Sequence, residues 1–243
     1  MRVLELWRYP VKSLQGERLT EAWIGPLGIP RDRGWALFDR DTGLGLTARR
    51  VPELLFGAAR ARADGGVEVV LPDGTVTAED AVLSDWLGRR VELRAATDNE
   101  GAAPTYEDPG DETPDGPTEW QQWQGATGPF HDSPRIRLSL VSTGTLGSWD
   151  RRRFRANVLL DGEGEDALRG RETYLGAARL AFGAPIFRCV MTTRPQPGGI
   201  ARDTSVLKTI HRERDGHLAV RAAVLGAGTV RTGDLLVPAG SAD

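Results

Sequence analysis

The chain has 243 residues, of which 40% are hydrophobic and 27% charged, with a formal net charge of −3 and one cysteine. This composition is that of a globular protein long enough to bury one large β domain or two smaller ones. The net charge argues against a general binder of nucleic acid or of a membrane surface, and no apolar run approaches the roughly 18 residues of a transmembrane helix.

The amino-terminal half carries short strand patterns broken by Gly and Pro. Apolar residues alternate with Arg2, Glu5 and Arg8 and predict a strand over 2–8, and these charges exclude a signal-peptide core. With one cysteine and no export signal, we expect a cytoplasmic protein. A helix is expected over 79–87, because its apolar side chains share one face and Gly88 follows it. Further strands are expected over 18–24, 34–39, 67–71, 75–77 and 91–94, and a short turn or helix over 52–56.

Residues 97–134 differ from both flanks in composition. As far as Pro117 the segment is acidic, rich in Pro and Gly and nearly free of aliphatic side chains, which predicts a linker or mobile loop. Trp120, Trp123 and Phe130 then follow. They indicate that this part docks on the rest of the protein; docking on the surface is favoured over a lid above a site.

The carboxy-terminal half again predicts strands with few helices. A polar cluster at Ser142 caps a short helix over 146–150, and Asp203 or Thr204 caps a helix over 205–212. Strands are expected over 136–141, 154–160, 173–175, 178–182, 186–191, 218–224, 229–232 and 235–237. Many short strands and few helices predict a mainly β fold, either a barrel or a sandwich.

The only cysteine, Cys189, lies in an apolar run with Arg188 directly before it. Free cysteines are usually buried and inert, so the sequence around Cys189 taken alone favours an inert residue over a ligand or nucleophile. A zinc site needs three or four protein ligands, and no orienting signature supports a nucleophilic pair with His211. A thiolate that adds one soft ligand to a metal carried by a cofactor fits better, and Arg188 favours the thiolate form.

Cations and hydroxyl groups able to surround an anionic cofactor occur at strand ends and polar turns of both halves. Taken singly, each is more simply a solvated surface group. The residues are Lys12, Ser13, Arg31, Arg33, Ser142, Thr143, Arg155, Asn157 and Arg188.

Several motifs occur together in the order typical of one family. Residues 9–13 (YPVKS), 28–35 (GIPRDRGW) and 46–49 (LTAR) resemble the amino-terminal β-barrel module of MOSC proteins. Residues 154–157 (FRAN), 188–193 (RCVMTT) and the closing Gly233-Asp234 resemble the MOSC domain. The chain therefore resembles MOSC domain proteins, among them the mitochondrial amidoxime-reducing component and its bacterial counterparts.

The resemblance implies a mainly β, barrel-like MOSC fold with a few short helices. It implies three parts: an amino-terminal β-barrel module over residues 1–96, the acidic segment 97–134 as a linker or loop, and a MOSC domain over residues 135–243. The match covers nearly the whole chain outside 97–134.

The resemblance also implies a molybdenum cofactor, a pyranopterin that brings most of the metal's ligands. It places the metal ligand and catalytic sulfur on Cys189, with Thr47 behind the cofactor contacts. Pyridoxal phosphate binding is a further property attached to the family. The implied cofactor contacts are Lys12, Ser13, Arg33, Ser142, Thr143, Gly144, Arg155, Asn157, Phe187, Arg188 and Cys189 itself.

The activity implied by the resemblance is an oxidoreductase that removes oxygen from small N-oxygenated compounds at a cysteine-ligated molybdenum. Because the sequence has no run of cysteines for an iron–sulfur domain, a separate protein is expected to deliver electrons; no nucleic-acid or membrane partner is expected. In one respect the chain departs from these reductases: Arg194 and Gln196 stand where an acidic residue follows the two threonines. Two alternatives therefore stay open: a carrier of the cofactor, or of sulfide on Cys189, without turnover, and a degenerate barrel without cofactor.

Overall fold

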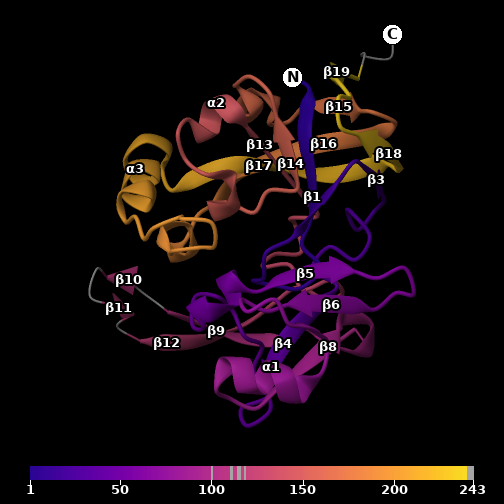
Figure 1. The fold of residues 1–243 in the computed structure, drawn as a ribbon. Helices are drawn as coiled ribbons and strands as arrows, with labels where there is room; N and C mark the ends of the chain where they lie inside the picture. The colour runs from indigo at the N-terminus through magenta and orange to yellow at the C-terminus, as the bar shows by residue number, and fades with distance from the viewer. Residues whose placement is uncertain (100, 110–111, 114–115, 118, 240–243) are drawn as a thin grey trace.

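A computed structural model of the chain describes residues 1–99, 101–109, 112–113, 116–117 and 119–239. The chain folds into two lobes, which Figure 1 shows one above the other. The upper lobe holds the carboxy-terminal half together with the first strands of the chain, and the lower lobe holds most of the remaining amino-terminal half. The amino-terminal residue and the last strand of the chain, Leu236–Pro238, both lie on the upper lobe.

The upper lobe is built on an eight-stranded sheet. Its neighbouring strands are antiparallel, except that β13 and β14 are parallel. The strand order is β19 (Leu236–Pro238), β15 (Glu172–Leu175), β16 (Ala178–Phe187), β17 (His217–Gly226), β13 (Leu138–Ser142), β14 (Val158–Leu160), β1 (Val3–Arg8) and β2 (Glu17–Leu19). A separate pair joins β3 (Glu21–Ile24) to β18 (Gly228–Arg231). The first strands of the chain therefore pair with its carboxy-terminal half.

The lower lobe consists of smaller sheets and one helix. The helix α1 (Asp80–Leu87) ends at Gly88, whose φ of 62° is the left-handed conformation that closes many helices. The antiparallel pairs are β4 (Trp35–Asp39) with β8 (Val91–Ala95), β9 (Thr105–Pro109) with β12 (Trp120–Gln124), and β10 (Glu112–Thr113) with β11 (Gly116–Pro117). A three-stranded sheet joins β5 (Ala58–Ala61), β6 (Val67–Val70) and β7 (Val76–Thr77).

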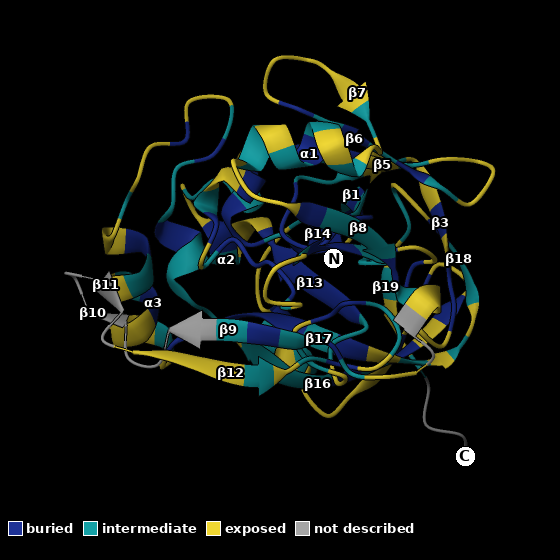
Figure 2. Cartoon of the chain, turned by 90° about the horizontal axis from the view of Figure 1, so that it is seen from below, coloured by how far each residue is buried: buried dark blue, intermediate teal, exposed yellow. Residues whose placement is uncertain are grey.

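Two apolar cores stabilise the lobes. In the upper core, Val3 and Ile24 pack with Leu140 and Val220, so it draws on both ends of the chain. The lower core lies within residues 11–91. Figure 2 shows β13 buried along its length, whereas β12 is largely exposed. Burial of apolar side chains from positions more than a hundred residues apart fixes the amino-terminal strands on the upper lobe.

The predicted mainly β fold with few helices is confirmed, although the strand pairs of the described residues do not close into a barrel. The predicted helix over 205–212 is confirmed as α3 (Ser205–Arg214). The helix expected over 146–150 begins earlier, as α2 (Thr143–Leu146), because the Ser142 hydroxyl accepts a bond from the Thr145 N–H.

Two predicted strands are shorter than expected. Only 158–160 of the stretch 154–160 is a strand, because the Asp150 carboxylate caps a 3-10 turn over Arg151–Arg153 directly before it. The strand expected over 186–191 ends at Phe187, and Val190–Thr193 form another 3-10 turn. Threonine hydroxyls bond the carbonyls of Cys189 and Val190 in that turn, which competes with strand pairing.

The segment 97–134 contains the paired strands β9 and β12, where the sequence predicts a linker or loop. Tyr106 and Phe130 are fully buried, and the Tyr106 and Trp123 rings lie 5.0 Å apart. The polar, Gly-rich composition hides this pairing because few of its side chains are aliphatic. Residues 100, 110–111, 114–115 and 118 of the segment lie outside the described residues.

None of the helices in the described part of the chain has the length and apolar character needed to cross a membrane.

Candidate functional site

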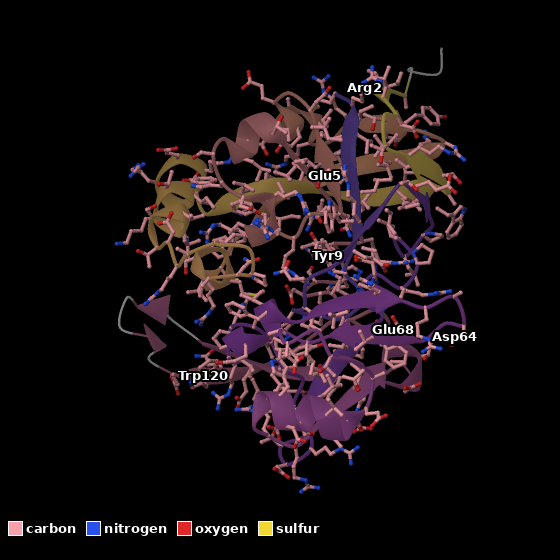
Figure 3. All side chains as sticks on the ribbon, viewed as in Figure 1. Arg2, Glu5, Tyr9, Asp64, Glu68 and Trp120 are labelled. Carbon is pink, nitrogen blue, oxygen red and sulfur yellow. The ribbon has the colours of Figure 1, made fainter. Side chains whose placement is uncertain are left out.

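A crevice between the two lobes is lined by residues of both. It has two chambers, which share Arg33, Arg49, His131, Asp132, Arg155 and Met191 as lining residues. The first, which we call the lysine chamber, has a volume of about 50 Å³ and reaches Lys12, Ser13, Thr47, Trp123 and Phe130. The second, the cysteine chamber, has a volume of about 170 Å³ and reaches Cys189, Arg188, Phe187 and Arg153. Figure 3 labels Tyr9 at the junction of the lobes.

The crevice brings together seven of the eleven implied cofactor contacts, and Thr47 lines its lysine chamber as well. Lys12, Ser13, Arg33 and Arg155 line the lysine chamber, and Phe187, Arg188 and Cys189 line the cysteine chamber. These residues come from positions as far apart as 12 and 189, so only the fold makes them neighbours.

The cluster of Ser142, Thr143 and Gly144 lines neither chamber. The Ser142 hydroxyl contacts the buried carboxylate of Glu165 at 2.5 Å, and the Thr143 hydroxyl donates to the Gly162 carbonyl at 3.3 Å. A Cβ on Gly144 would approach Glu163 to 2.5 Å. These contacts show a helix cap packed against a neighbouring turn.

The backbone of the lysine chamber adopts an unusual conformation at three positions. Ser13, Arg33 and Arg155 have φ values of 70°, 52° and 53°, in the left-handed region that costs energy for residues other than glycine. Only six non-glycine residues of the described chain have a positive φ, and three of them line this chamber. Such strain gathers at binding sites, where surrounding contacts hold it.

Two arginines of the chamber are held by one tyrosine. The guanidinium carbons of Arg33 and Arg155 lie 4.6 and 4.5 Å from the centroid of the buried Tyr9 ring. Burial, reinforced by Arg33, lowers the pKa of Arg155 to about 10. Behind them, the buried Asp32 carboxylate pairs with Arg33 and accepts a bond from the Asn157 amide at 3.0 Å. Asn157 itself lines neither chamber. It contacts Asp32 and so acts on Arg33 through that carboxylate.

Lys12 is enclosed by side chains of the segment 97–134. Its ammonium, only 5% exposed, donates to the Phe130 carbonyl at 3.1 Å, pairs with Asp132 and lies 4.7 Å from the Tyr106 ring centroid. Burial lowers the pKa of Lys12, against the opposing effect of Asp132. Although partial desolvation of its carboxylate raises the pKa of Asp132, the charges of Lys12, Arg49 and Arg33 outweigh this effect and hold that pKa well below its usual range. The Asp132 carboxylate is therefore ionised at neutral pH.

The Cys189 sulfur lies in the cysteine chamber with a guanidinium beside it. Arg49 Nε donates to Cys189 Sγ at 3.3 Å. Arg188, which the sequence places next to the thiol, donates instead to the carbonyls of Leu218 at 2.7 Å and Phe154 at 3.0 Å. Burial lowers the pKa of Arg188 to about 10. The cation that contacts the sulfur is therefore on the lower lobe.

The stretch 194–198 joins the lobes by hydrogen bonds. Arg194 donates to the Arg49 carbonyl at 2.8 Å, and the buried Gln196 accepts from the Gln15 amide at 2.9 Å. This stretch has no acidic residue. Among the described residues that line either chamber, Asp132 is the one with a carboxylate.

His131 and Asp132 are site residues that the sequence motifs do not single out. His131 is 4% exposed, burial lowers its pKa to about 4, and its Nε2 has no partner among the described residues. The imidazole is therefore neutral at pH 7. The available signal was the return of Trp123 and Phe130 just before these residues, which indicated docking but not a site. Arg49 and Arg153 also line the crevice without having been assigned to it.

Comparison with known proteins identifies two family models. Residues 1–102 match the MOSC N-terminal beta barrel domain, and residues 129–237 match the MOSC domain. None of the curated proteins matches the chain.

Similar solved structures include YiiM from Geobacillus stearothermophilus, at 17% identity and a TM-score of 0.37 over 49% of this chain and 67% of that one. They also include the YUAD protein from Bacillus subtilis, at 11% identity and a TM-score of 0.43 over 97% of this chain and 93% of that one.

Proposed function

Since this chain belongs to the MOSC proteins, with a MOSC N-terminal barrel ahead of the MOSC domain, we propose that its crevice binds the molybdenum cofactor. We propose further that the loaded protein is an oxidoreductase that reduces small N-oxygenated compounds. The observation that carries the proposal is that Cys189 shares one crevice with Lys12, Arg33, Arg49 and Arg155.

The donor set of the crevice fits this cofactor. Within the described residues, no three His, Cys, Asp or Glu side chains come together to hold a metal ion, so a metal beside Cys189 has to bring its other ligands. Three buried polar atoms of the lining residues, Thr47 Oγ1, His131 Nε2 and one Arg188 nitrogen, have no partner among the described residues. Buried polar groups are nearly always satisfied, which supports a bound polar ligand as their partner.

In this proposal, Cys189 ligates the metal in the cysteine chamber. Lys12, Ser13, Arg33 and Arg155 bind the phosphate end of the cofactor, because guanidinium and ammonium groups match phosphate oxygens. When bound, the cofactor supplies a redox-active metal for oxygen removal from the substrate.

The chain's own groups prepare the crevice for a substrate. Tyr9 orients two of the arginines, and the neutral His131 adds no further positive charge to the crowded cations. Phe187, 61% exposed at the cysteine chamber, offers an apolar face to a small molecule. Electrons come from a separate protein in this proposal.

The test is turnover by the protein made in a host that produces the cofactor. With a chemically reduced viologen as electron donor, consumption of an N-hydroxylated amidine by protein that contains molybdenum is the expected result. Folded protein that contains molybdenum but fails to reduce any N-hydroxylated compound would contradict the reductase part of the proposal.

A second candidate function is a carrier that binds the cofactor, or sulfide on Cys189, without turnover. It is favoured by the pairing of Asp132 with Lys12, which leaves the crevice without a free carboxylate for proton handling in the described structure. Molybdenum content without reductase activity distinguishes this carrier from the enzyme.

A further inference from the structure

The ion pair of Lys12 and Asp132 combines two side chains of very different exposure. Lys12 is 5% exposed and comes from the loop after β1, whereas Asp132 is 64% exposed and follows the hairpin of β9 and β12. Asp132 lines both chambers. It therefore contacts the buried ammonium and also borders the rest of the crevice.

The charges of the crevice are strongly unbalanced without this aspartate. Lys12, Arg33, Arg49 and Arg155 line the lysine chamber, and Asp132 is its one described anionic lining residue. A buried ammonium without a nearby anion is costly, so some anion has to neutralise Lys12. An anionic ligand that reaches Lys12 competes with the Asp132 carboxylate for the same donor.

The carboxylate is placed so that it can leave. Residues 132–135 form bends and a turn outside any helix or strand, and most of the Asp132 side chain already contacts water. No other hydrogen bond is described for its carboxylate. Release of Asp132 into solvent therefore exposes a charge that water solvates well, while Lys12 stays in place against the Phe130 carbonyl.

We propose that Asp132 is a displaceable internal counter-ion, which neutralises Lys12 in the empty crevice and yields its place to a phosphate group entering the lysine chamber. This inference rests on the proposed function only in assigning an anionic ligand to the crevice. It assigns to the segment 97–134 a control over ligand entry, because that segment supplies the competing charge.

The test measures binding of inorganic phosphate to the purified chain by isothermal titration calorimetry. Asp132→Asn keeps the size of the side chain and an oxygen that accepts from Lys12, but removes the charge. We expect it to bind phosphate about tenfold more tightly than the wild type, because a competing unit charge a few ångströms away is gone. The matched control is Asp41→Asn, which removes the same charge from the exposed ion pair with Arg90; its phosphate affinity is expected to equal that of the wild type.

A double variant identifies the site of binding. Lys12→Met combined with Asp132→Asn is expected to lose the gain in affinity, because the phosphate then lacks the freed ammonium. Equal or weaker phosphate binding by Asp132→Asn, with thermal unfolding showing a folded protein, would overturn the inference, since Asp132 would then support the site. A gain that persists without Lys12 would overturn it as well. Neither result depends on molybdenum, so a failure of the proposed function leaves this test intact.

Discussion

His131 predicts a specific loss of stability in mild acid. The imidazole is buried beside the crevice, and burial lowers its pKa to about 4 from an ordinary value of 6.5. The Asp32 carboxylate opposes this and is the largest of the nearby charge effects, while Arg33, Arg137 and Lys12 act in the same direction as burial. Folding therefore requires His131 to be neutral throughout the physiological pH range.

The sign and size of the effect follow from proton linkage. Between about pH 6.5 and pH 4 the unfolded chain binds a proton at His131 that the folded protein excludes, so stability rises with pH across this window. The contribution of neutral His131 to the free energy of unfolding is fully present above pH 6.5 and is lost as the pH drops toward 4. The full difference in pKa corresponds to a loss of about 3 kcal/mol in the free energy of unfolding.

Urea unfolding followed by tryptophan fluorescence, repeated from pH 7.5 to pH 4.5, measures this loss. The comparison protein is His131→Gln, which keeps a polar side chain but cannot titrate. We expect the wild type to lose about 2–3 kcal/mol more than His131→Gln across the series. Parallel pH profiles of the two proteins would contradict a lowered pKa of His131, because they would mean that His131 is protonated as easily in the folded protein as in the unfolded chain.

Three further predictions concern other side chains. Asp132→Asn is expected to lower the free energy of unfolding at pH 7 by only about 1 kcal/mol, because solvent screens an ion pair whose carboxylate is largely solvated. Folding lowers the pKa of Asp132, so the difference in unfolding free energy between the variant and the wild type should shrink as the pH falls below about 4. Ser142→Ala, which breaks the cap and leaves the buried Glu165 short of a donor, is expected to cost about 1–3 kcal/mol in urea unfolding but to leave molybdenum content unchanged. Asn157→Ala is expected to cost a similar amount and also to reduce molybdenum content, because the buried aspartate it bonds holds Arg33; unchanged metal content would contradict that role.

Local patterns predict the elements of this fold better than their arrangement. The strand over residues 2–8 follows from the alternation of apolar and charged residues, and the end of α1 follows from Gly88. Nothing in either pattern indicates that β1 lies between β14 and β2, because that pairing depends on how distant apolar faces are buried together. The hairpin of β9 and β12 is missed because its buried residues are aromatic and set among polar ones.

The residues of the candidate site are likewise predicted in part, because local motifs identify some of them and long-range packing decides the others. Motifs over residues 9–13, 154–157 and 188–193 predict Lys12, Arg155 and Cys189 as site residues, and the crevice brings them together. The resemblance also implies Ser142 as a cofactor contact, whereas in the structure its hydroxyl caps a helix and lines neither chamber. Asp132 and the contact of Arg49 with the sulfur depend on the packing of one lobe against the other, which no local spacing encodes.

The proposed function depends above all on Cys189 holding a metal that a cofactor brings to this crevice. The direct measurement is the molybdenum-to-protein ratio, by mass spectrometry of the metal, in wild type and Cys189→Ala purified from a host that makes the cofactor. Ser142→Ala is the matched control, because Ser142 lines neither chamber. We expect substantial molybdenum in the wild type and the control, and its loss from Cys189→Ala in a protein that remains folded. Only trace molybdenum in the folded wild type, or an unchanged ratio in Cys189→Ala, would contradict the proposed function.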